Sequence, residues 1–344
     1  MHKPLVSILM PAYNAEKYIG MAIKGILNQT FTDFEFVIIN DGSTDNTEQI
    51  IKSFTDKRIL NKKQENQGVA KTLNNGLEIC KGKYIRRHDA DDLSTPNSLK
   101  EQVEFIENNL DVGLVSSRQV YMTENSKIAK KYGLPSDAFF EGEKYKYVTL
   151  EDFTYQSSSP IVHGTVLFNK ELVQKLGNYR PEFLTSEDND LWTRILEHKK
   201  IVILNSKSYY QRLHSGSAII KYKSSLRFYR EKVLDFATER QKTGTDPLMR
   251  DEKMPKPIIE NINVAQNKDL RLAKKRKLFR NDILDYKYRI FVDAKDWKLI
   301  KQSIKTALKD GWKLKQTWKA ILFPVLGEKF VKFGVKLKTI LRKF

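Results

Sequence analysis

Short apolar runs alternate with helical stretches over the first two thirds of the chain, and this alternation restricts the fold more than any other feature. The runs with β-strand composition are LVSILM (5–10), FEFVIIN (34–40) and YIRRH (84–88). The stretches with helical spacing lie near 15–28, 44–54 and 67–80. Because strands that alternate with helices form parallel sheets, we predict an α/β fold with a mostly parallel sheet and helices on both faces.

The charge of the chain changes near residue 220. The 344 residues include 61 Lys and Arg and 42 Asp and Glu, which gives a formal net charge of +19. After residue 220 lie 33 of these basic and 14 of these acidic residues, so the first 220 residues hold 28 of each. The strand and helix alternation gives way there to a Lys-rich, mainly helical pattern. We therefore predict an α/β domain at 1–220 and a basic helical region at 221–344.

The cysteine content and the lengths of the apolar runs indicate the cellular compartment of the protein. Cys80 is the single cysteine, which excludes an internal disulfide, and the opening residues MHKPLVSILMP form no signal-type apolar run. No window reaches the roughly 18–20 apolar residues that a membrane span needs. These features predict a cytoplasmic protein.

Three polar clusters follow predicted strands, where sheets of this kind bind their ligands. They are PAYNAE (11–16), NDGSTDNT (40–47) and the acidic run within YIRRHDADDLSTP (84–96). Each has a purely structural interpretation. Thr44 or Asp45 would cap a helix after the second cluster, and Ser94 or Thr95 would cap a helix that starts at Pro96.

The acidic run is not explained by a helix cap. Asp89, Asp91 and Asp92 lie within four positions directly after a strand, where their like charges repel, so a positive charge must compensate. Mg²⁺ and Mn²⁺ take carboxylate oxygens together with phosphate oxygens. A divalent cation bound with a phosphorylated substrate would account for the three carboxylates.

The order of several motifs resembles the inverting family-two glycosyltransferases, which have the GT-A nucleotide-sugar-binding fold. The motifs are VSILMPAYNAEKYI, DGSTDNT, NQGVAKTLNNGL, GKYIRRHDADD, HGTVLFNKELVQKLGNYRPEF, SEDNDLWTRI and YYQRLHSGSAI. A lone D-x-D is weak evidence, but this ordered set is specific, and it covers roughly residues 4–220. The resemblance implies transfer of a sugar with inversion from a nucleotide-diphosphate donor, with UDP-sugar the expected class, to a saccharide or lipid-linked saccharide in bacterial surface-polysaccharide synthesis.

The resemblance also implies which residues hold the nucleotide. Those that match are Pro11, Ala12, Tyr13, Glu16, Asp41, Asn66, Gly68 and Asp89. The first four belong to a loop that closes over the base, and Asp41 contacts the base or ribose. The sequence departs from the family at Leu73, where many relatives have an arginine, and at His88, where an apolar residue is usual.

The resemblance also implies which residues bind the metal and which residue is catalytic. Asp91 would bind Mn²⁺ or Mg²⁺ directly and Asp89 the ribose or a metal-bound water, while His214 matches a metal or diphosphate ligand. In SEDNDLW (186–192), Asp188 matches the base that takes the proton of the acceptor hydroxyl.

Two further residues match the acceptor side. Glu187 would bind the acceptor, and His163 would line the pocket for the acceptor and the donor sugar. A structural alternative exists for SEDNDLW, since acidic residues also favour a helix N-terminus through the macrodipole.

Two other classes of function use similar features. Sugar-nucleotide nucleotidyltransferases share the sheet and an acidic metal site, but PAYNAEKYIG lacks their Gly-rich phosphate loop with a basic residue. A nucleic-acid-binding protein would fit the pI of about 9.6 and RLAKKRKLFR (271–280). The neutral first two thirds and the paired acidic motifs weigh against it, so we expect no nucleic-acid partner.

The C-terminal stretch has the pattern of a helix at a membrane surface. After Gly327, large apolar residues recur at three- and four-residue steps while lysines and arginines fall on the other side. Such a helix is drawn to anionic lipid, although it could instead pack on the first domain. We predict peripheral attachment to the inner face of the cell membrane through residues 312–344, aided by 271–280.

Overall fold

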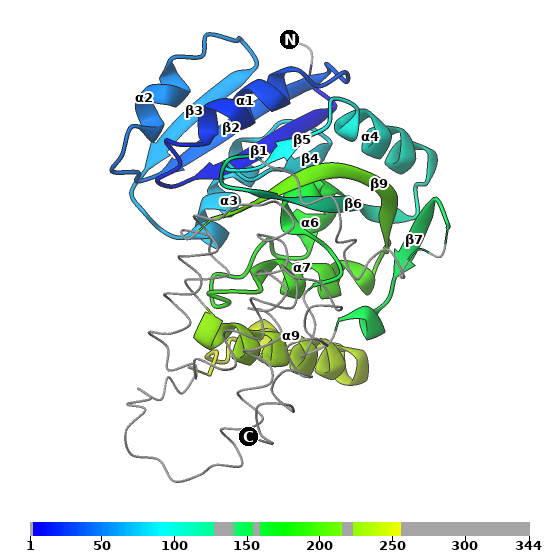
Figure 1. The fold of residues 1–344 in the computed structure, drawn as a ribbon. Coiled ribbons are helices and arrows are strands. Elements are labelled where there is room, and N and C mark those ends of the chain that lie inside the picture. Colours follow the sequence, from blue (N-terminus) through cyan, green and yellow to red (C-terminus); the bar gives the residue numbers. More distant parts are fainter. Residues whose placement is uncertain (1–2, 127–139, 141, 154–158, 215–222, 256–344) are drawn as a thin grey trace, which may run out of the picture. The chain divides into compact units, whose positions relative to one another are not determined.

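The computed structural model describes residues 3–126, 140, 142–153, 159–214 and 223–255. Within them, strands of one nine-stranded sheet are ordered β3-β2-β1-β4-β8-β6-β9-β5, and β7 pairs with β9 (Figure 1). The strands are β1 (Val6–Ala12), β2 (Phe34–Asp41), β3 (Ile59–Gln64), β4 (Tyr84–Arg87), β5 (Leu93–Ser94), β6 (Val112–Thr123), β7 (Tyr145–Val148), β8 (Leu167–Asn169) and β9 (Lys200–Leu213). The helices are α1 (Ile19–Leu27), α2 (Thr47–Lys52), α3 (Val69–Ile79), α4 (Ser98–Asn108), α6 (Lys170–Lys175), α7 (Glu187–Leu196) and α9 (Lys223–Thr243), with 3₁₀ turns η1 (Leu150–Asp152), η2 (His163–Thr165) and η3 (Pro247–Arg250).

The predicted alternation of strands and helices is confirmed, and the sheet changes direction after β4. Strands β3, β2, β1 and β4 pair in parallel, with Val6 opposite both Phe34 and Tyr84. Beyond β4 the pairs β4 with β8, β8 with β6, and β5 and β7 with β9 are antiparallel. The sequence analysis did not include the short strand β3, since its residues ILNKKQ are mostly polar and half-exposed at the edge of the sheet. The parallel strands bring the loops after β1, β2 and β4 to one edge.

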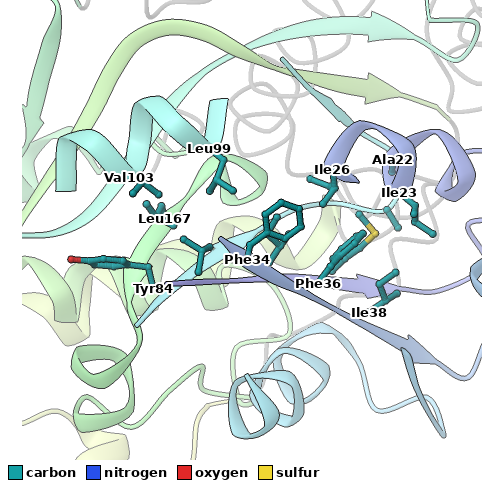
Figure 2. Packing of buried hydrophobic residues seen from close by; sticks show 14 of the residues in the cluster. Ala22, Ile23, Ile26, Phe34, Phe36, Ile38, Tyr84, Leu99, Val103 and Leu167 are labelled. Atoms are coloured by element: carbon teal, nitrogen blue, oxygen red, sulfur yellow. The ribbon is translucent and has the colours of Figure 1, made fainter. Parts of the chain in front are cut away.

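Two apolar layers hold helices against the two faces of the sheet, as predicted. On one face, Ile19, Ala22, Ile23 and Ile26 of α1 follow helical spacing and pack with Phe34, Phe36 and Ile38 of β2, and Leu99 and Val103 of α4 extend the same layer (Figure 2). On the other face, α3, α6 and α7 contribute Leu73, Leu77, Val173, Leu191, Trp192 and Ile195 to a second layer. Because α7 packs in the second layer, its acidic N-terminus lies at the antiparallel part of the sheet.

The chain divides into two compact units. The first comprises Met1–Val120, Pro135–Gln211 and Ser215–Glu260, and the second comprises Tyr121–Leu134, Arg212–His214 and Asn261–Phe344. Within the second unit, the buried Arg212 donates from Nη1 to the Glu124 carbonyl at 3.0 Å and to Ser126 Oγ at 2.9 Å.

The first unit continues past residue 220, where the charge change had placed the end of the α/β domain. Helix α9 contributes Tyr229, Val233 and Phe236 to a small apolar cluster with Phe183, the residue that precedes the acidic motif by a few positions. The predicted membrane-surface segment 312–344 and the basic run 271–280 lie outside the described residues. None of the described helices combines the length and the apolar character needed to cross a bilayer.

Candidate active site

The loops after β1 and β2 are joined by hydrogen bonds between backbone and short polar side chains. The Ala15 N–H donates to Thr47 Oγ1 at 2.8 Å, and the Glu16 N–H donates to Asp45 Oδ2 at 3.1 Å. In return, Glu16 Oε2 accepts from the backbone and side-chain N–H groups of Asn46, at 3.1 and 3.0 Å. Glu16 therefore holds the start of α2, where Asn46 is the N-cap residue.

Asp41 links these loops to the N-terminus of α3. Its Oδ1 accepts from Gln64 Nε2 at 2.8 Å and from the Gln67 N–H at 2.9 Å, and its Oδ2 accepts from the Gly68 N–H at 3.1 Å. Asn66 Nδ2 donates to the Asp41 carbonyl at 3.0 Å. Gly68, with φ of 83°, is the N-cap of α3 and adopts a backbone conformation that favours glycine.

The residues predicted to bind the nucleotide thus gather at one edge of the sheet. We call the segments 11–16, 41–47 and 66–68 the edge loops. Pro11 and Ala12 end β1, and Tyr13 follows them with 49% of its surface exposed. The sequence placed Asp41 in one motif and Asn66 and Gly68 in another, and the structure joins the two motifs directly.

The acidic run begins with an ion pair inside the protein. Buried Arg87 pairs through Nη1 with Asp89 Oδ2, and Tyr209 OH donates to the same oxygen at 3.1 Å. Burial alone would lower the pKa of Arg87, but the Asp89 carboxylate raises it above its usual value. The sequence analysis had assigned all of the compensating charge to a metal ion, and Arg87 provides part of it. Asp89 therefore has a fixed orientation.

Because Gly164 has no side chain, it leaves room for the Asp89 carboxylate of the ion pair and for Tyr209 OH. A Cβ at this position would be 2.0 Å from Tyr209 OH and 2.7 Å from Asp89 Oδ2. Such distances are shorter than van der Waals contact, so any side chain would displace the tyrosine or the carboxylate. Gly164 lies in the 3₁₀ turn η2 beside His163.

His88, which departs from the family pattern, has a structural role. Its Nδ1 lies 2.8 Å from the Asp89 carbonyl and its Nε2 lies 2.8 Å from Ser94 Oγ. Burial, followed by the charge of Arg86, lowers its pKa to about 3. His88 is therefore neutral at physiological pH and joins the two ends of the acidic loop.

The carboxylates of the acidic run fit part of a site for a hard divalent cation. Asp89 and Asp91 are half-buried at the end of β4, and Asp92 is buried. In the described part of the chain, no three His, Cys, Asp or Glu side chains are grouped closely enough to hold a metal by themselves. A cation at this position would therefore need oxygens from a bound substrate, which is the usual arrangement for Mg²⁺ with phosphates.

The N-terminus of α7 is a buried acidic site. Ser186, with φ of 70°, is the N-cap, and Glu187, Asp188 and Asp190 form the first turn. Glu187 is 7% exposed, and its Oε1 lies 3.8 Å from Nδ1 of His163. His163 Nε2 lies 3.0 Å from Tyr179 OH. The structure thus brings together the two residues that were predicted to line the acceptor side.

Burial sets the protonation states of this group. Burial and the neighbouring Asp188 raise the pKa of Glu187 to about 8, and burial also raises the pKa of Asp188. Burial and the charge of Arg87 lower the pKa of His163 well below its usual value. Near neutral pH, Glu187 is therefore protonated and His163 is neutral.

Arg87 connects the two acidic sites electrostatically. Its charge stabilises the ionised forms of both Glu187 and Asp188, in addition to its ion pair with Asp89. The two acidic sites are also neighbours in space, because Gly164 lies against Asp89 and the preceding His163 lies against Glu187. His214 belongs to the second compact unit, so its predicted contact with a metal or diphosphate stays a prediction.

Four residues of this site were missed by the sequence analysis: Arg87, Gly164, Tyr179 and Tyr209. Arg87 lies two positions before Asp89, so its charge was a usable signal. Tyr209 lies 120 positions after Asp89, and nothing in its local sequence indicates the contact.

Comparisons with known proteins agree with this geometry. The family model described as glycosyl transferase family 2 matches residues 7–177. An uncharacterized glycosyltransferase of Methanocaldococcus jannaschii is 36% identical over 201 residues, which cover 57% of this chain and 66% of that protein, just under two thirds of its length. EpsE of Bacillus subtilis, assigned as a glycosyltransferase, is 30% identical over 200 residues, which cover 56% of this chain and 67% of EpsE.

A solved structure shares the fold. Residues 1–349 of Staphylococcus aureus TarS, in complex with UDP-GlcNAc, superpose with a TM-score of 0.53. The match covers 90% of this chain and 93% of that one at 17% sequence identity. At this identity the likeness establishes the fold alone.

Proposed function

Since the chain belongs to glycosyl transferase family 2, we propose that it transfers a sugar with inversion from a nucleotide-diphosphate donor to a hydroxyl group of a saccharide acceptor. The observation that carries this proposal is the pair of acidic sites joined by Arg87, one next to the edge loops and one at the start of α7. A single-displacement transfer needs these two sites, because the diphosphate leaves from one face of the sugar and the acceptor attacks from the other.

We propose that the donor binds along the edge loops. Asp41 already accepts two backbone N–H groups, so its position is fixed before a ligand arrives, and Tyr13 is exposed beside it. A preorganised polar loop of this kind binds a nucleoside without a large ordering cost. The UDP-GlcNAc complex of TarS supports a UDP-sugar as the first donor to test.

Asp91 would hold Mn²⁺ or Mg²⁺ together with the diphosphate of the donor, and Asp89 would contact the ribose or a metal-bound water. When bound, the cation supplies Lewis-acid stabilisation of the negative charge that develops on the leaving nucleoside diphosphate. Arg87 fixes Asp89 in place for this task, and Tyr209 fixes the same carboxylate oxygen.

Asp188 would act as the base. It lies half-buried at the start of the helix. It would accept the proton of the acceptor hydroxyl as the bond to the anomeric carbon forms. Glu187, protonated near neutral pH, would donate a hydrogen bond to an oxygen of the saccharide acceptor. His163, whose Nδ1 lies 3.8 Å from Glu187 Oε1, would limit the movement of the Glu187 side chain.

The experiment is a screen of nucleotide sugars for release of nucleoside diphosphate, with Mn²⁺ present. Asp188→Asn should lower turnover by about 10²–10⁴-fold, because general-base catalysis contributes that much, while UDP still raises the melting temperature. Asp91→Ala should abolish metal-dependent turnover. Asp235→Asn, which alters an exposed ion pair on α9, is the control. Full turnover by Asp188→Asn at saturating donor would refute the assignment of the base.

Stereochemistry gives an independent test. An α-linked nucleotide sugar should give a β-linked product, which the anomeric proton in an NMR spectrum identifies. Retention of configuration would contradict a single displacement.

We further propose that the enzyme extends a surface polysaccharide at the membrane. The support is sequence-based: residues 312–344 combine apolar and basic faces, and each basic residue near an anionic surface contributes about 1 kcal/mol. The intact chain should co-sediment with anionic vesicles and not with neutral ones, and a chain truncated before Trp312 should lose this binding. Equal binding by both chains would refute the assignment.

A further inference from the structure

Two buried aromatic side chains hold the ring of His163 beside Glu187. The centroid of the His163 ring lies 5.7 Å from that of Trp192, in an edge-to-face contact, and 5.4 Å from that of Tyr179. Trp192 is fully buried in α7, and Tyr179 is 1% exposed. The imidazole therefore has little room to turn, and its two nitrogens have different neighbours: Nε2 lies 3.0 Å from Tyr179 OH, and Nδ1 lies 3.8 Å from Glu187 Oε1.

The backbone of Tyr179 is fixed by α3 and by α7. Asn74 of α3 donates from Nδ2 to the Tyr179 carbonyl at 2.8 Å and accepts from the Tyr179 N–H at its Oδ1 at 3.1 Å. The preceding residue, Asn178, has φ of 59°, and its carbonyl accepts from Arg194 Nη2 of α7 at 2.8 Å. The position of the Tyr179 hydroxyl is therefore set by the protein and does not depend on a ligand.

The hydrogen of the Tyr179 hydroxyl determines the tautomer of His163. Neutral imidazole carries one N–H, so a contact between Nε2 and a hydroxyl can run in either direction. Within the residues that the structure describes, the Tyr179 hydroxyl makes one hydrogen bond, to His163 Nε2. If Nε2 were the donor, the hydroxyl hydrogen would be buried without an acceptor, which is unfavourable. The hydroxyl is therefore the donor, and the N–H of His163 is on Nδ1, the nitrogen that faces Glu187.

This tautomer determines which oxygen of Glu187 holds the carboxyl proton. An N–H group that faces Oε1 disfavours a proton on that oxygen, so the proton of the neutral carboxyl is on Oε2. The 3.8 Å separation is longer than a hydrogen bond, and contacts of this kind in a site without substrate often shorten when the substrate binds. In the opposite tautomer, the lone pair of Nδ1 would accept the proton of Glu187, and Glu187 could not donate it to a substrate.

We propose that Tyr179 is a positioning residue for the reaction: its hydroxyl donates to His163 Nε2, the Nδ1–H of His163 faces Glu187 Oε1, and Glu187 Oε2 is left to donate to an oxygen of the saccharide acceptor. All of these hydrogen bonds run in one direction, from the interior of the protein towards the acceptor. The first two concern the protein alone. The last rests on the proposed function, because it requires that Glu187 binds the acceptor.

The first experiment determines the tautomer of His163 in the intact chain near neutral pH. In a nitrogen NMR spectrum of isotope-labelled histidine, a protonated ring nitrogen and one with a lone pair differ in chemical shift, and His163→Gln identifies the His163 signals. We expect Nδ1 to be protonated. Tyr179→Phe removes the donor to Nε2, so both signals should move towards those of the Nε2–H tautomer. Tyr84→Phe is the matched control, because its hydroxyl donates to Glu107 at the start of β4, and it should leave the signals unchanged.

The second experiment measures nucleoside diphosphate release with Mn²⁺, the nucleotide sugar that the donor screen identifies, and increasing concentrations of the saccharide that accelerates release. Tyr179→Phe should lower kcat/KM for the saccharide by about two- to tenfold, which is the effect of one lost hydrogen bond. The KM for the nucleotide sugar should stay unchanged, whereas a general loss of structure would alter both. Tyr84→Phe should change neither constant.

The outcomes separate this inference from the proposed function. A wild-type spectrum with Nε2 protonated would overturn the inference, and this result decides the matter if Tyr179→Phe does not fold in a thermal unfolding scan. If Tyr179→Phe folds and keeps the wild-type kcat/KM for the saccharide, its hydroxyl does not position Glu187 and the inference is wrong. If the wild type releases no nucleoside diphosphate from any nucleotide sugar, it is the proposed function that fails, while the spectrum still tests the hydrogen bonds within the protein.

Discussion

The edge loops and the surroundings of α7 are both polar, but they satisfy their polar groups in different ways. In the edge loops, short side chains such as Thr47 and Asp45 accept from nearby backbone N–H groups, and most of these contacts are half-exposed. Around α7, full charges are buried against one another, as Asp246 is against Arg180 and Arg240. The first arrangement fixes a shape that a ligand can match, and the second changes how strongly protons are bound.

This difference has an energetic consequence. A half-exposed hydrogen bond contributes about 0.5–1.5 kcal/mol, because water can replace either partner. A buried charge that loses its partner costs about 3–5 kcal/mol, because water cannot reach it. Equivalent substitutions in the two regions should therefore have unequal effects on the free energy of unfolding.

The largest effect is expected at Asp246. Asp246→Asn should lower the free energy of unfolding by about 3–5 kcal/mol, because Arg180 and Arg240 lose their shared negative charge. Urea denaturation measures the change, and Asp235→Asn on the exposed side of α9 is the control, expected to change stability by less than about 1 kcal/mol. A loss below about 1 kcal/mol at Asp246 would mean that its ion pairs with Arg180 and Arg240 do not stabilise the unit.

A smaller effect is expected at Gly164. Gly164→Ala should lower stability by about 1–3 kcal/mol, because the new Cβ meets Tyr209 OH and Asp89 Oδ2. The rate of nucleoside diphosphate release should fall by more than the loss of folded protein would explain, because the new Cβ displaces the Asp89 carboxylate. Gly25→Ala in α1 is the matched control: its Cβ would meet only Leu93 Cδ2 at 3.9 Å, so a gain of about 0.5–1 kcal/mol is expected. Unchanged activity in Gly164→Ala would show that the site tolerates a shifted Asp89.

The pH dependence of the free energy of unfolding should reveal the raised pKa of Glu187. Its pKa of about 8 in the folded protein lies above the ordinary value of 4.5, so its contribution to stability is complete below about pH 4.5 and is lost as the pH rises through 8. Glu187→Gln removes this titration. Between pH 6 and pH 9 the wild type should lose about 2–3 kcal/mol that the variant does not lose. Parallel melting curves for the two proteins over this range would show that Glu187 is not protonated in the folded state.

The smallest effect is expected in the edge loops. Asp45→Asn should lower the free energy of unfolding by about 0.5–1 kcal/mol, because Asn keeps an oxygen for the Thr47 N–H but loses the second oxygen, which accepts from the Glu16 N–H. The substitution is the same as at Asp246, so one pair of urea titrations tests the comparison. Equal losses at Asp45 and Asp246 would contradict it. UDP should still stabilise the Asp45 variant thermally.

The sequence alone determined the order of the elements and the positions of the loops. Strands predicted at 5–10, 34–40 and 84–88 are observed at Val6–Ala12, Phe34–Asp41 and Tyr84–Arg87. Apolar periodicity is a local property, so it can be recognised without the fold. Because parallel strands end at one edge of a sheet, the polar motifs after them could be placed together before any contact was known.

Only the tertiary structure decided which charges meet and how strongly they bind protons. Tyr209 reaches Asp89 across 120 positions, and His163 reaches Glu187 from the turn before β8. Asp246 pairs with Arg180 and Arg240 from beyond the predicted end of the domain. The local sequence indicates neither the distance between two such side chains nor their burial. A carboxyl group has an ordinary pKa in water, and it is the removal of water by distant segments of the chain that raises the pKa of Glu187 to about 8.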